Sequence, residues 1–531
     1  MLTSFFTSVR RGLQAFREAF LTTSNSVGEL IQFTDYEARK VRYDINWASY
    51  EGTMFRDIHA WAQQLRKTYN LYTHIRNIYN PSFRLAEFYR TSVWRGIVNM
   101  DAEEKGAIPI KLKDNSNTKL RTAVSAVFKN SNIQTLKGLF VLYGTVFGDV
   151  GIRVVDDPTR KMVYLDIEQP SKIKSVAADN RDFLKGYELE DSVILEGKLH
   201  VYGEKCTRTA TGVLFETFLD GKPWAFNGKP SSWTEPYPFV PFLLTKHVDV
   251  GLEFGWSEMH AARSKFYELD DMASKTHDQI RKLVDPVWLF NFSKPKTGLS
   301  IKSENKPDTG VIIPPAPAGA DRPLDRSEVP AMYVNDTQAK AQALVSDLNV
   351  ADVLTALDRL IRELEAEYPE LQIDLWNTTD TASGKALYIA REKVESKLLD
   401  RRAAYDMMLI RAIQMAISIG ALRGYPGFEG FTADSYANGE LDMVIAERPV
   451  FPVNQAEQVA SKTKVWTVVI EAVSQGMDPM PILKDYGYTE EMIANLGLDN
   501  IVKRSEEVAE SSNADAEAKS SPPEDKEVAT Q

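Results

Sequence analysis

The residues that could do chemistry are scattered along this chain. Zinc sites need closely spaced histidines, as in HExxH, or paired cysteines and histidines. The six histidines have neither spacing, so each is expected to be a surface or core residue: His59, His74, His200, His247, His260 and His277. The single cysteine, Cys206, excludes an internal disulfide and a cysteine-rich zinc site. The sequence therefore predicts no metal centre.

Two acidic pairs, Asp270–Asp271 and Glu363–Glu365, have the residue types that a two-carboxylate hydrolase uses. Both lie in stretches of helical periodicity beside basic residues, so solvated helix charge is the simpler interpretation. Residues 381–386 (TASGKA) resemble the end of a phosphate-binding loop. A Walker A loop would need Gly at position 379 and Ser or Thr at position 386, where this chain has Thr379 and Ala386. Neither an enzyme nor a bound cofactor is predicted.

Three long stretches have apolar residues at helical spacing, over residues 255–283, 336–367 and 384–419. A predicted strand at 287–292 and a proline-rich loop separate the first two, and turn chemistry fills 371–383. The apolar stripes on the first two helices need partners, which we expect neighbouring subunits to supply. The proline-rich loop carries four lysines that could contact an acidic partner surface or DNA, or could simply keep the loop soluble: Lys294, Lys296, Lys302 and Lys306.

The N-terminal half combines aromatic-rich helical patterns with alternating β patterns. Helices are expected within 37–99 and over 118–143. Residues 149–156 and 161–168 alternate and are joined by a Pro-containing turn, which predicts a β-hairpin. Further strands are expected at 186–190, 199–202, 213–219 and 239–247, so residues 148–250 form an antiparallel β module and the fold class is α+β. Towards the C-terminus we expect a strand at 441–446 and helices at 455–475 and 480–496.

Both ends of the chain differ in composition from the middle. Residues 1–20 place Phe and other apolar side chains at helical spacing between three arginines, and Arg10–Arg11 interrupts the apolar run that a signal peptide needs. A helix that docks on its own or a neighbouring subunit is expected there, with a membrane-surface helix as the alternative. Residues 505–531 contain eight acids and two lysines, which is typical of a solvated disordered tail. No apolar run approaches a transmembrane span, so membrane contact is not expected.

The order of several short segments resembles the portal proteins of tailed bacteriophages of the siphophage type. The hairpin at 148–173 (GDVGIRVVDDPTRKMVYLDIEQPSKI) resembles the family's wing β-region. The segments YPFVPF at 237–242 and FGWSE at 254–258 resemble the approach to the first stem helix. TASGKAL at 381–387 resembles the Ser-Gly-x-Ala-Leu segment that follows the tunnel loop, and Pro452 with the helix after it resembles the start of the crown. The resemblance covers residues 40–500.

The resemblance implies a division of the chain into the parts of a portal subunit. Outside it lie an N-terminal amphipathic segment (1–36) and an acidic tail (505–531). Between them it implies a wing (37–250, with its β module from about 148), stem helix 1 (251–283), a clip (284–335), stem helix 2 (336–370), a tunnel loop (371–383), a long wing helix (384–425) and a helical crown (426–504). DNA would face the tunnel-loop residues Leu375, Trp376, Asn377, Thr378, Thr379, Asp380 and Thr381.

A portal protein forms a ring of twelve subunits at one capsid vertex, assembled in the host cytoplasm and retained in the virion. The resemblance implies that the ring nucleates procapsid assembly and is the channel for DNA packaging and ejection. Its partners would be double-stranded DNA in transit, the terminase large subunit and head–tail adaptor at the clip lysines, and the major capsid and scaffold proteins. The net charge of −11 fits a channel through which DNA slides without tight binding. A scaffold or adaptor protein, or an unrecognised hydrolase, is the alternative.

Overall fold

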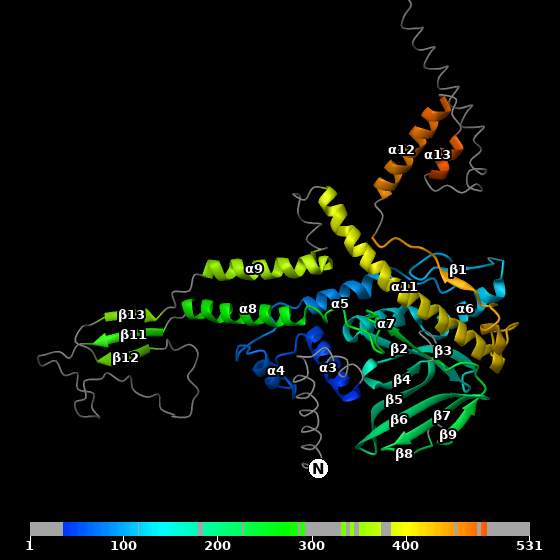
Figure 1. Ribbon diagram of the computed structural model, residues 1–531, viewed down its shortest axis with the longest axis horizontal. Helices are drawn as coiled ribbons and strands as arrows, with labels where there is room; N and C mark the ends of the chain where they lie inside the picture. Colours follow the sequence, from blue (N-terminus) through cyan, green and yellow to red (C-terminus); the bar gives the residue numbers. More distant parts are fainter. Residues whose placement is uncertain are drawn as a thin grey trace, which may run out of the picture. The chain divides into compact units, whose positions relative to one another are not determined.

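The computed structural model contains helices together with mainly antiparallel sheets, which confirms the predicted α+β class (Figure 1). Contacts divide the chain into two units, Met1–Val450 and Phe451–Gln531. The structure describes residues 35–114, 116–178, 184–225, 228–284, 287–292, 331–335, 340–344, 350–372, 384–451, 455–474 and 479–485.

The N-terminal part of the first unit is helical, as predicted, with two of its helices started by asparagine caps. The Asn80 side chain accepts a hydrogen bond from the Phe83 amide, and Asn117 does the same for Leu120. The pattern over 118–143 corresponds to two helices rather than one, because Asn132 between them adopts a left-handed conformation with φ of 47°. The helices are α3 (Tyr36–Glu51), α4 (Ala62–Thr68), α5 (Pro81–Ser92), α6 (Thr118–Asn130) and α7 (Ile133–Phe147).

Two antiparallel sheets form the predicted β module. The first has the order β10-β2-β3, and β2 and β3 form the predicted hairpin, with Gly151 opposite Glu168 and Asp157 opposite Met162. The second has the order β4-β5-β6-β7-β8, with β9 also paired to β7. The strands are β2 (Asp149–Asp157), β3 (Met162–Glu168), β4 (Ile173–Ala178), β5 (Leu184–Leu195), β6 (Lys198–Thr209), β7 (Gly212–Leu219), β8 (Lys222–Pro223), β9 (Ser232–Glu235) and β10 (Phe242–Lys246).

The first long helix is shorter than its apolar stripe. Helix α8 spans Arg263–Val284, whereas a helix was expected from residue 255. Residues 254–262 form turns instead, and the Val248–Trp256 bridge ties this stretch to the end of the β module. Met259 and Ala262 of this turn segment are buried in the same core as α8. The apolar stripe in the sequence therefore begins before the helix does.

The second long helix also begins later than expected. Helix α9 spans Val350–Glu367, and strand β13 (Lys340–Leu344) lies where the sequence predicted helix from residue 336. This strand pairs with β11 (Val287–Phe292), the predicted strand, which also pairs in parallel with β12 (Ala331–Asn335). The sheet order is β12-β11-β13. Sheet pairing with a distant strand has overridden the local apolar spacing.

The apolar faces of α8 and α9 cover each other. Phe266 and Leu269 of α8 share one core with Leu357 and Leu364 of α9, and the core extends to residues of α3, α5 and α7. Lys265 near the start of α8 pairs with Glu367 at the end of α9, so the two helices run antiparallel. The expectation that neighbouring subunits must supply partners for these stripes is therefore wrong for most of their length, although Leu354 remains 47% exposed.

Helix α11 (Gly384–Arg423) has 40 residues and confirms the predicted third long helix. It contacts all three strands of the first sheet (Figure 1). Its residues Tyr405 and Leu409 are buried. The short strands β1 (Ile110–Leu112) and β14 (Met443–Ile445) form a separate pair, which confirms the predicted strand near 441–446. The 3-10 turns are η1 (Pro170–Lys172), η2 (Pro369–Gln372) and η3 (Ala433–Tyr436).

The second unit contains α12 (Gln455–Ser474), which confirms the helix expected at 455–475, and α13 (Pro479–Asp485). Val465, Val469 and Leu483 form its small core. The sequence placed a boundary before residue 426, whereas contacts place residues 426–450 with the first unit.

Candidate functional site: a buried ion network

The site residues proposed from the sequence lie outside the described part of the chain. These are the tunnel-loop residues Leu375, Trp376, Asn377, Thr378, Thr379, Asp380 and Thr381 and the lysines Lys294, Lys296, Lys302 and Lys306. The structure does describe what borders them. Turn η2 precedes the first group and α11 follows it, while β11 and β12 flank the second group.

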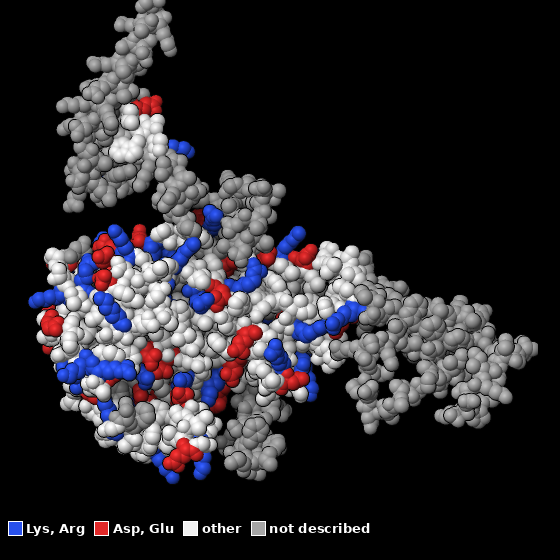
Figure 2. Space-filling model, turned by 180° about the vertical axis from the view of Figure 1, so that it is seen from behind, with Lys and Arg blue, Asp and Glu red and all other residues white. Residues whose placement is uncertain are grey.

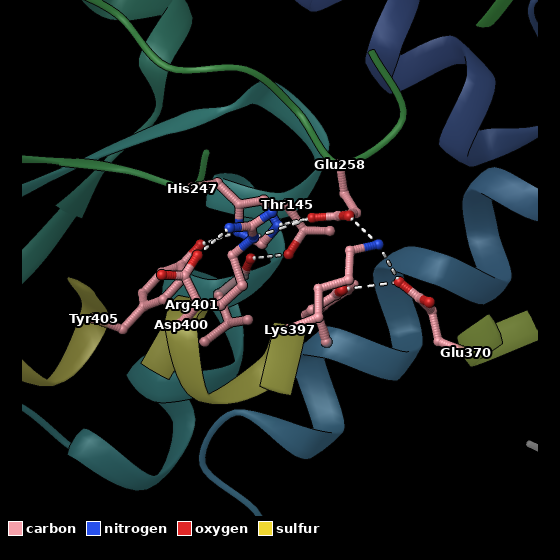
Figure 3. Close-up of polar contacts among 10 residues, drawn as sticks. Thr145, His247, Glu258, Glu370, Lys397, Asp400, Arg401 and Tyr405 are labelled. Atoms are coloured by element: carbon pink, nitrogen blue, oxygen red, sulfur yellow. Dashed lines mark hydrogen bonds and ion pairs between the residues drawn. The ribbon is translucent and has the colours of Figure 1, made fainter. Parts of the chain in front are cut away.

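A buried ion network lies where the start of α8, the end of α9 and the middle of α11 meet (Figure 3). Its centre is Glu258, whose side chain is 3% exposed and belongs to the turn segment before α8. Lys397 Nζ on α11 lies 2.6 Å from Glu258 Oε1, and Arg401 Nε, one turn further along, lies 3.2 Å from Glu258 Oε2. One carboxylate therefore ties the segment leading into α8 to two cations of α11.

Lys397 bonds a second carboxylate at the end of α9. Its Nζ lies 2.6 Å from Oε1 of Glu370 in turn η2, and the side chain of Glu370 is fully buried. The Tyr89 hydroxyl of α5 donates to the same oxygen at 2.8 Å. The Lys397 ammonium also lies over the rings of Tyr368 and Tyr89. A single lysine thus links the start of α8 and the end of α9 to α11.

His247, just after β10, completes the network on the sheet side. Its Nε2 lies 3.0 Å from Glu258 Oε2, and its Nδ1 lies 2.8 Å from the Tyr405 hydroxyl. Burial lowers the pKa of His247 and outweighs the hydrogen bond to Glu258, so the imidazole is neutral at pH 7. A neutral ring fits both contacts, because Nε2–H donates to Glu258 while Nδ1 accepts from Tyr405.

The buried carboxylates and the cations of the network are equal in number. Burial by itself would raise the pKa of Glu258, but the His247 hydrogen bond and the charges of Lys397 and Arg401 outweigh it. The pKa of Glu258 therefore lies well below its usual range, and this carboxylate is ionised at pH 7. Two buried carboxylates face Lys397 and Arg401, and Arg401 also pairs with the exposed Asp400 at 2.7 Å.

Two glycines allow this close packing. A Cβ at Gly144 of α7 would lie 1.9 Å from the Tyr405 hydroxyl oxygen, so only glycine leaves room for that side chain. Gly148, which ends α7, has φ of 100°, and a Cβ there would lie 2.6 Å from the Ser257 amide nitrogen. The segment before α8 therefore crosses directly over the end of α7.

Asp149 fixes that crossing from the other side. Its Oδ1 accepts a hydrogen bond from the Gly255 amide at 2.6 Å, and its Oδ2 accepts one from the Tyr43 hydroxyl at 2.8 Å. Burial raises the pKa of Asp149 to about 6. The Gly148–Asp149 and 254–258 segments, which were noted separately in the sequence, are thus in contact.

A second group of buried contacts fastens α11 to the chain after α5. Arg402 Nε donates to the Val93 carbonyl at 2.9 Å, and Arg402 also donates to the carbonyls of Ser92 and Arg448. Asp406, one turn along α11, accepts from the Trp94 indole at 2.7 Å and pairs with Arg448. Helix α11 is therefore held by charge-assisted bonds along more than two turns.

The acidic pair Asp270–Asp271 holds a loop and is not solvated. Asp270 is 1% exposed, and its Oδ1 accepts the amides of Ile78 and Tyr79, each at 2.9 Å. Asp271, 8% exposed, accepts the Tyr72 amide. Burial raises the pKa of Asp270 to about 7. The interpretation of this pair as solvated helix charge is wrong, because both carboxylates bind backbone amides of a segment almost 200 residues away in sequence.

The network is suited to holding helices in place. Its polar groups bond one another, and the hollow lined by Glu103, Glu104, Lys105 and Arg121 lies in another part of the chain. Within the described ranges, no group of three His, Cys, Asp or Glu residues could hold a metal ion. Sequence reasoning had treated His247 as a core or surface residue and gave no role to Glu258 or Lys397, because no local pattern joins residues so far apart.

Within the part of the chain that the structure describes, one helix meets the length and composition of a membrane span, contrary to the sequence expectation. It comprises residues 391–423, and 61% of its most apolar window is buried inside the protein, as in the core helix of a globular fold. Comparisons with known proteins found no matching family model and no matching curated protein.

Proposed function

We propose that this chain is the subunit of a bacteriophage portal ring, in which twelve copies surround a channel for DNA at one capsid vertex. The observation that carries the proposal is the unit formed by α8, the β12-β11-β13 sheet and α9. Two antiparallel helices pack on each other, and a small sheet is connected directly between them. In a portal subunit, one stem helix leads to the clip and a second stem helix returns from it, and α8, the sheet and α9 would take these places.

The β12-β11-β13 sheet corresponds to the proposed clip. Strand β11 begins three residues after α8 ends, and β13 ends six residues before α9 begins. The central β11 pairs with both other strands, so the two helices lead into the same sheet. In the proposed assembly this sheet, with the lysines between β11 and β12, is where the terminase large subunit and later the head–tail adaptor dock.

Helix α11 and the ion network support the same proposal. The 40 residues of α11 span about 60 Å, and Lys397 joins this helix to the start of α8 and the end of α9, which lie at the same end of the proposed stem. A subunit that transmits force between a motor at the clip and the surrounding capsid needs such a rigid connection. The segment between η2 and α11 would be the loop that faces DNA.

The charge of the chain suits a conduit for DNA. The net charge is −11, and a ring of twelve subunits multiplies it. Acidic and basic side chains are interspersed over the face seen in Figure 2, where they form no continuous basic patch among the described residues. Tight DNA binding requires neutralisation of phosphates by clustered Lys and Arg. A channel of this charge lets DNA slide, while ATP turnover belongs to the terminase and not to this chain.

The proposal places the chain in the virion, at the portal vertex, after assembly in the host cytoplasm. The ring would nucleate the procapsid through contacts with major capsid and scaffold proteins. Leu354 of α9 and Ile280 of α8 are 47% and 37% exposed, and neighbouring subunits would cover them.

The native mass of the purified full chain tests this proposal. We expect a species of about twelve times the 59.8 kDa subunit, over a range of salt concentrations. Leu354→Lys should shift the mass towards the monomer, whereas Ile97→Lys, at a 78% exposed position outside the stem, should leave it unchanged. A stable monomer or dimer of the unmodified chain under all salt conditions would contradict the ring.

A further inference from the structure

The tip of the β5–β6 hairpin is a two-stranded ribbon. Strand β4 pairs with β5 only as far as Leu189, and β7 pairs with β6 only from Tyr202 onward. Residues 190–201 therefore have ladder partners only within the hairpin, which closes in a turn at Glu196 and Gly197 with φ of 50° and 76°. A two-stranded ribbon is marginally stable in water unless one of its faces is covered.

One face of this ribbon is apolar and exposed. Ile194 lies directly opposite Leu199, and Val201 lies diagonally across from Ile194. Their exposed fractions are 74%, 71% and 43%. Three neighbouring aliphatic side chains on one face of a ribbon form a patch that normally has a partner.

The start of α3 lies beside the base of this face. Side chains alternate along β5, so Glu190 is on the same face as Ile194. Lys40 of α3 approaches Glu190 to 4.0 Å, and the Tyr36 hydroxyl donates to the Ser171 carbonyl at 3.0 Å. Figure 1 places α3 next to β4 and β5. The chain that precedes Tyr36 therefore emerges next to the ribbon.

We propose that the apolar face of the β5–β6 ribbon is the docking surface for residues 1–20 of the same chain. The sequence of this segment carries apolar side chains at helical spacing: Phe5, Phe6, Val9, Leu13, Phe16 and Phe20. The fifteen residues from Leu21 to Asp35 can reach about 50 Å when extended. The distance along β5 from Glu190 to Ile194 is about 13 Å. The segment thus reaches the patch easily.

The two segments carry opposite net charges in sequence. Residues 1–20 contain three arginines and one glutamate. Residues 184–201 contain four acids and two lysines, namely Glu188, Glu190, Asp191 and Glu196 against Lys185 and Lys198. Glu188, Glu190 and Asp191 already pair with lysines of the fold, so the pairing with residues 1–20 rests mainly on apolar contact and on reach. The inference concerns one chain and does not depend on the ring.

Thiol labelling of the full chain tests whether the patch is covered. Leu199→Cys should react with a maleimide about tenfold more slowly than Ile97→Cys at a comparably exposed position, because a docked segment shields the thiol. The native Cys206 is 1% exposed and contributes little background. Adding Leu13→Ser and Phe16→Ser should bring the Leu199→Cys rate to that of Ile97→Cys, while Gln14→Ser should leave it slow.

Equal labelling of the two positions in the full chain overturns the proposal, and so does protection that the Leu13→Ser and Phe16→Ser changes do not release. A second experiment tests whether the docked segment belongs to the same subunit as the ribbon. The double variant Phe16→Cys and Leu199→Cys is treated with a short bismaleimide crosslinker. A crosslink within one subunit is expected. A crosslink between two subunits, or none, overturns the assignment to the same chain.

Discussion

The ammonium of Lys397 on α11 lies 2.6 Å from the buried carboxylate of Glu258, just before α8. The two residues are 139 positions apart in the sequence. The same ammonium lies 2.6 Å from Glu370 at the end of α9. This one side chain is therefore the cation that Glu258 and Glu370 share, while Arg401 is a second cation beside Glu258 alone.

Replacing Lys397 by Met should destabilise the fold by about 2–4 kcal/mol, since it removes a cation from two buried carboxylates while leaving the lysine side chain's apolar volume. Water reaches part of this lysine, which is 26% exposed, so the loss is smaller than for a fully enclosed ion pair. Urea unfolding at pH 7 measures the change. Lys393→Met, one turn earlier at an exposed position, is the matched control and should alter stability by less than about 0.5 kcal/mol. Equal effects of the two substitutions would exclude this role for Lys397.

Gly144→Ala should cost about 1–3 kcal/mol, because the new methyl group would overlap the Tyr405 hydroxyl and displace it from His247. Gly138→Ala on the same helix has only Arg90 atoms at 4.0 Å from its Cβ. That control should be neutral or stabilising by up to about 1 kcal/mol, owing to the higher helix propensity of alanine. Thermal unfolding of both variants makes the comparison. A harmless Gly144→Ala would mean that Tyr405 has another position available.

Stability should depend on pH through His260. Burial, together with Arg263 and Arg42, lowers the pKa of His260 to about 3. The unfolded chain takes up this proton near pH 6.5, so the histidine's contribution is complete above that pH and is lost as the pH falls below it. Relative to His260→Gln, the wild type should lose about 1–2 kcal/mol between pH 7.5 and 5, with allowance for partial exposure.

Urea unfolding of wild type and His260→Gln at both pH values measures this difference. Comparison with the variant is essential, since Asp149 and Asp270 have raised pKa values of about 6 and about 7 and act in the opposite direction. Their folded forms bind protons more readily than the unfolded chain, so their contribution grows as pH falls. If the difference in unfolding free energy between wild type and His260→Gln is the same at both pH values, the pKa of His260 is not lowered in the folded state.

Asp270→Ala should destabilise the protein by about 2–4 kcal/mol, because the amides of Ile78 and Tyr79 lose their acceptor. Glu268→Ala, at an exposed position on the same helix, should change stability by less than about 0.5 kcal/mol. Hydrogen exchange should also increase at those two amides in Asp270→Ala. Unchanged exchange there would show that the loop is held by other contacts.

Much of the fold could be predicted because its signals are local. The β2–β3 hairpin has alternating residues on both sides of a Pro-containing turn, and residues 385–419 of α11 contain no Gly or Pro. The starts of α8 and α9 were wrong, since apolar spacing does not distinguish a helix from the turn at 254–262 or from strand β13. The fold class was therefore easier to predict than the residues at which the helices begin.

The ion network could not be predicted, because its members are brought together only by the tertiary fold. Glu258, Glu370 and Lys397 each look like an ordinary charged residue near or within a helix. The acids at 270 and 271 were misjudged for the same reason, as the amides that they bind come from residues 72–79. Long-range pairing of charges leaves no periodic trace in a single sequence.

The most direct test of the portal proposal is electron microscopy of the purified full chain in negative stain. The account predicts closed rings of about twelve subunits, each with a central opening. Open assemblies or particles without a central channel would contradict it, and would favour a scaffold or adaptor protein instead.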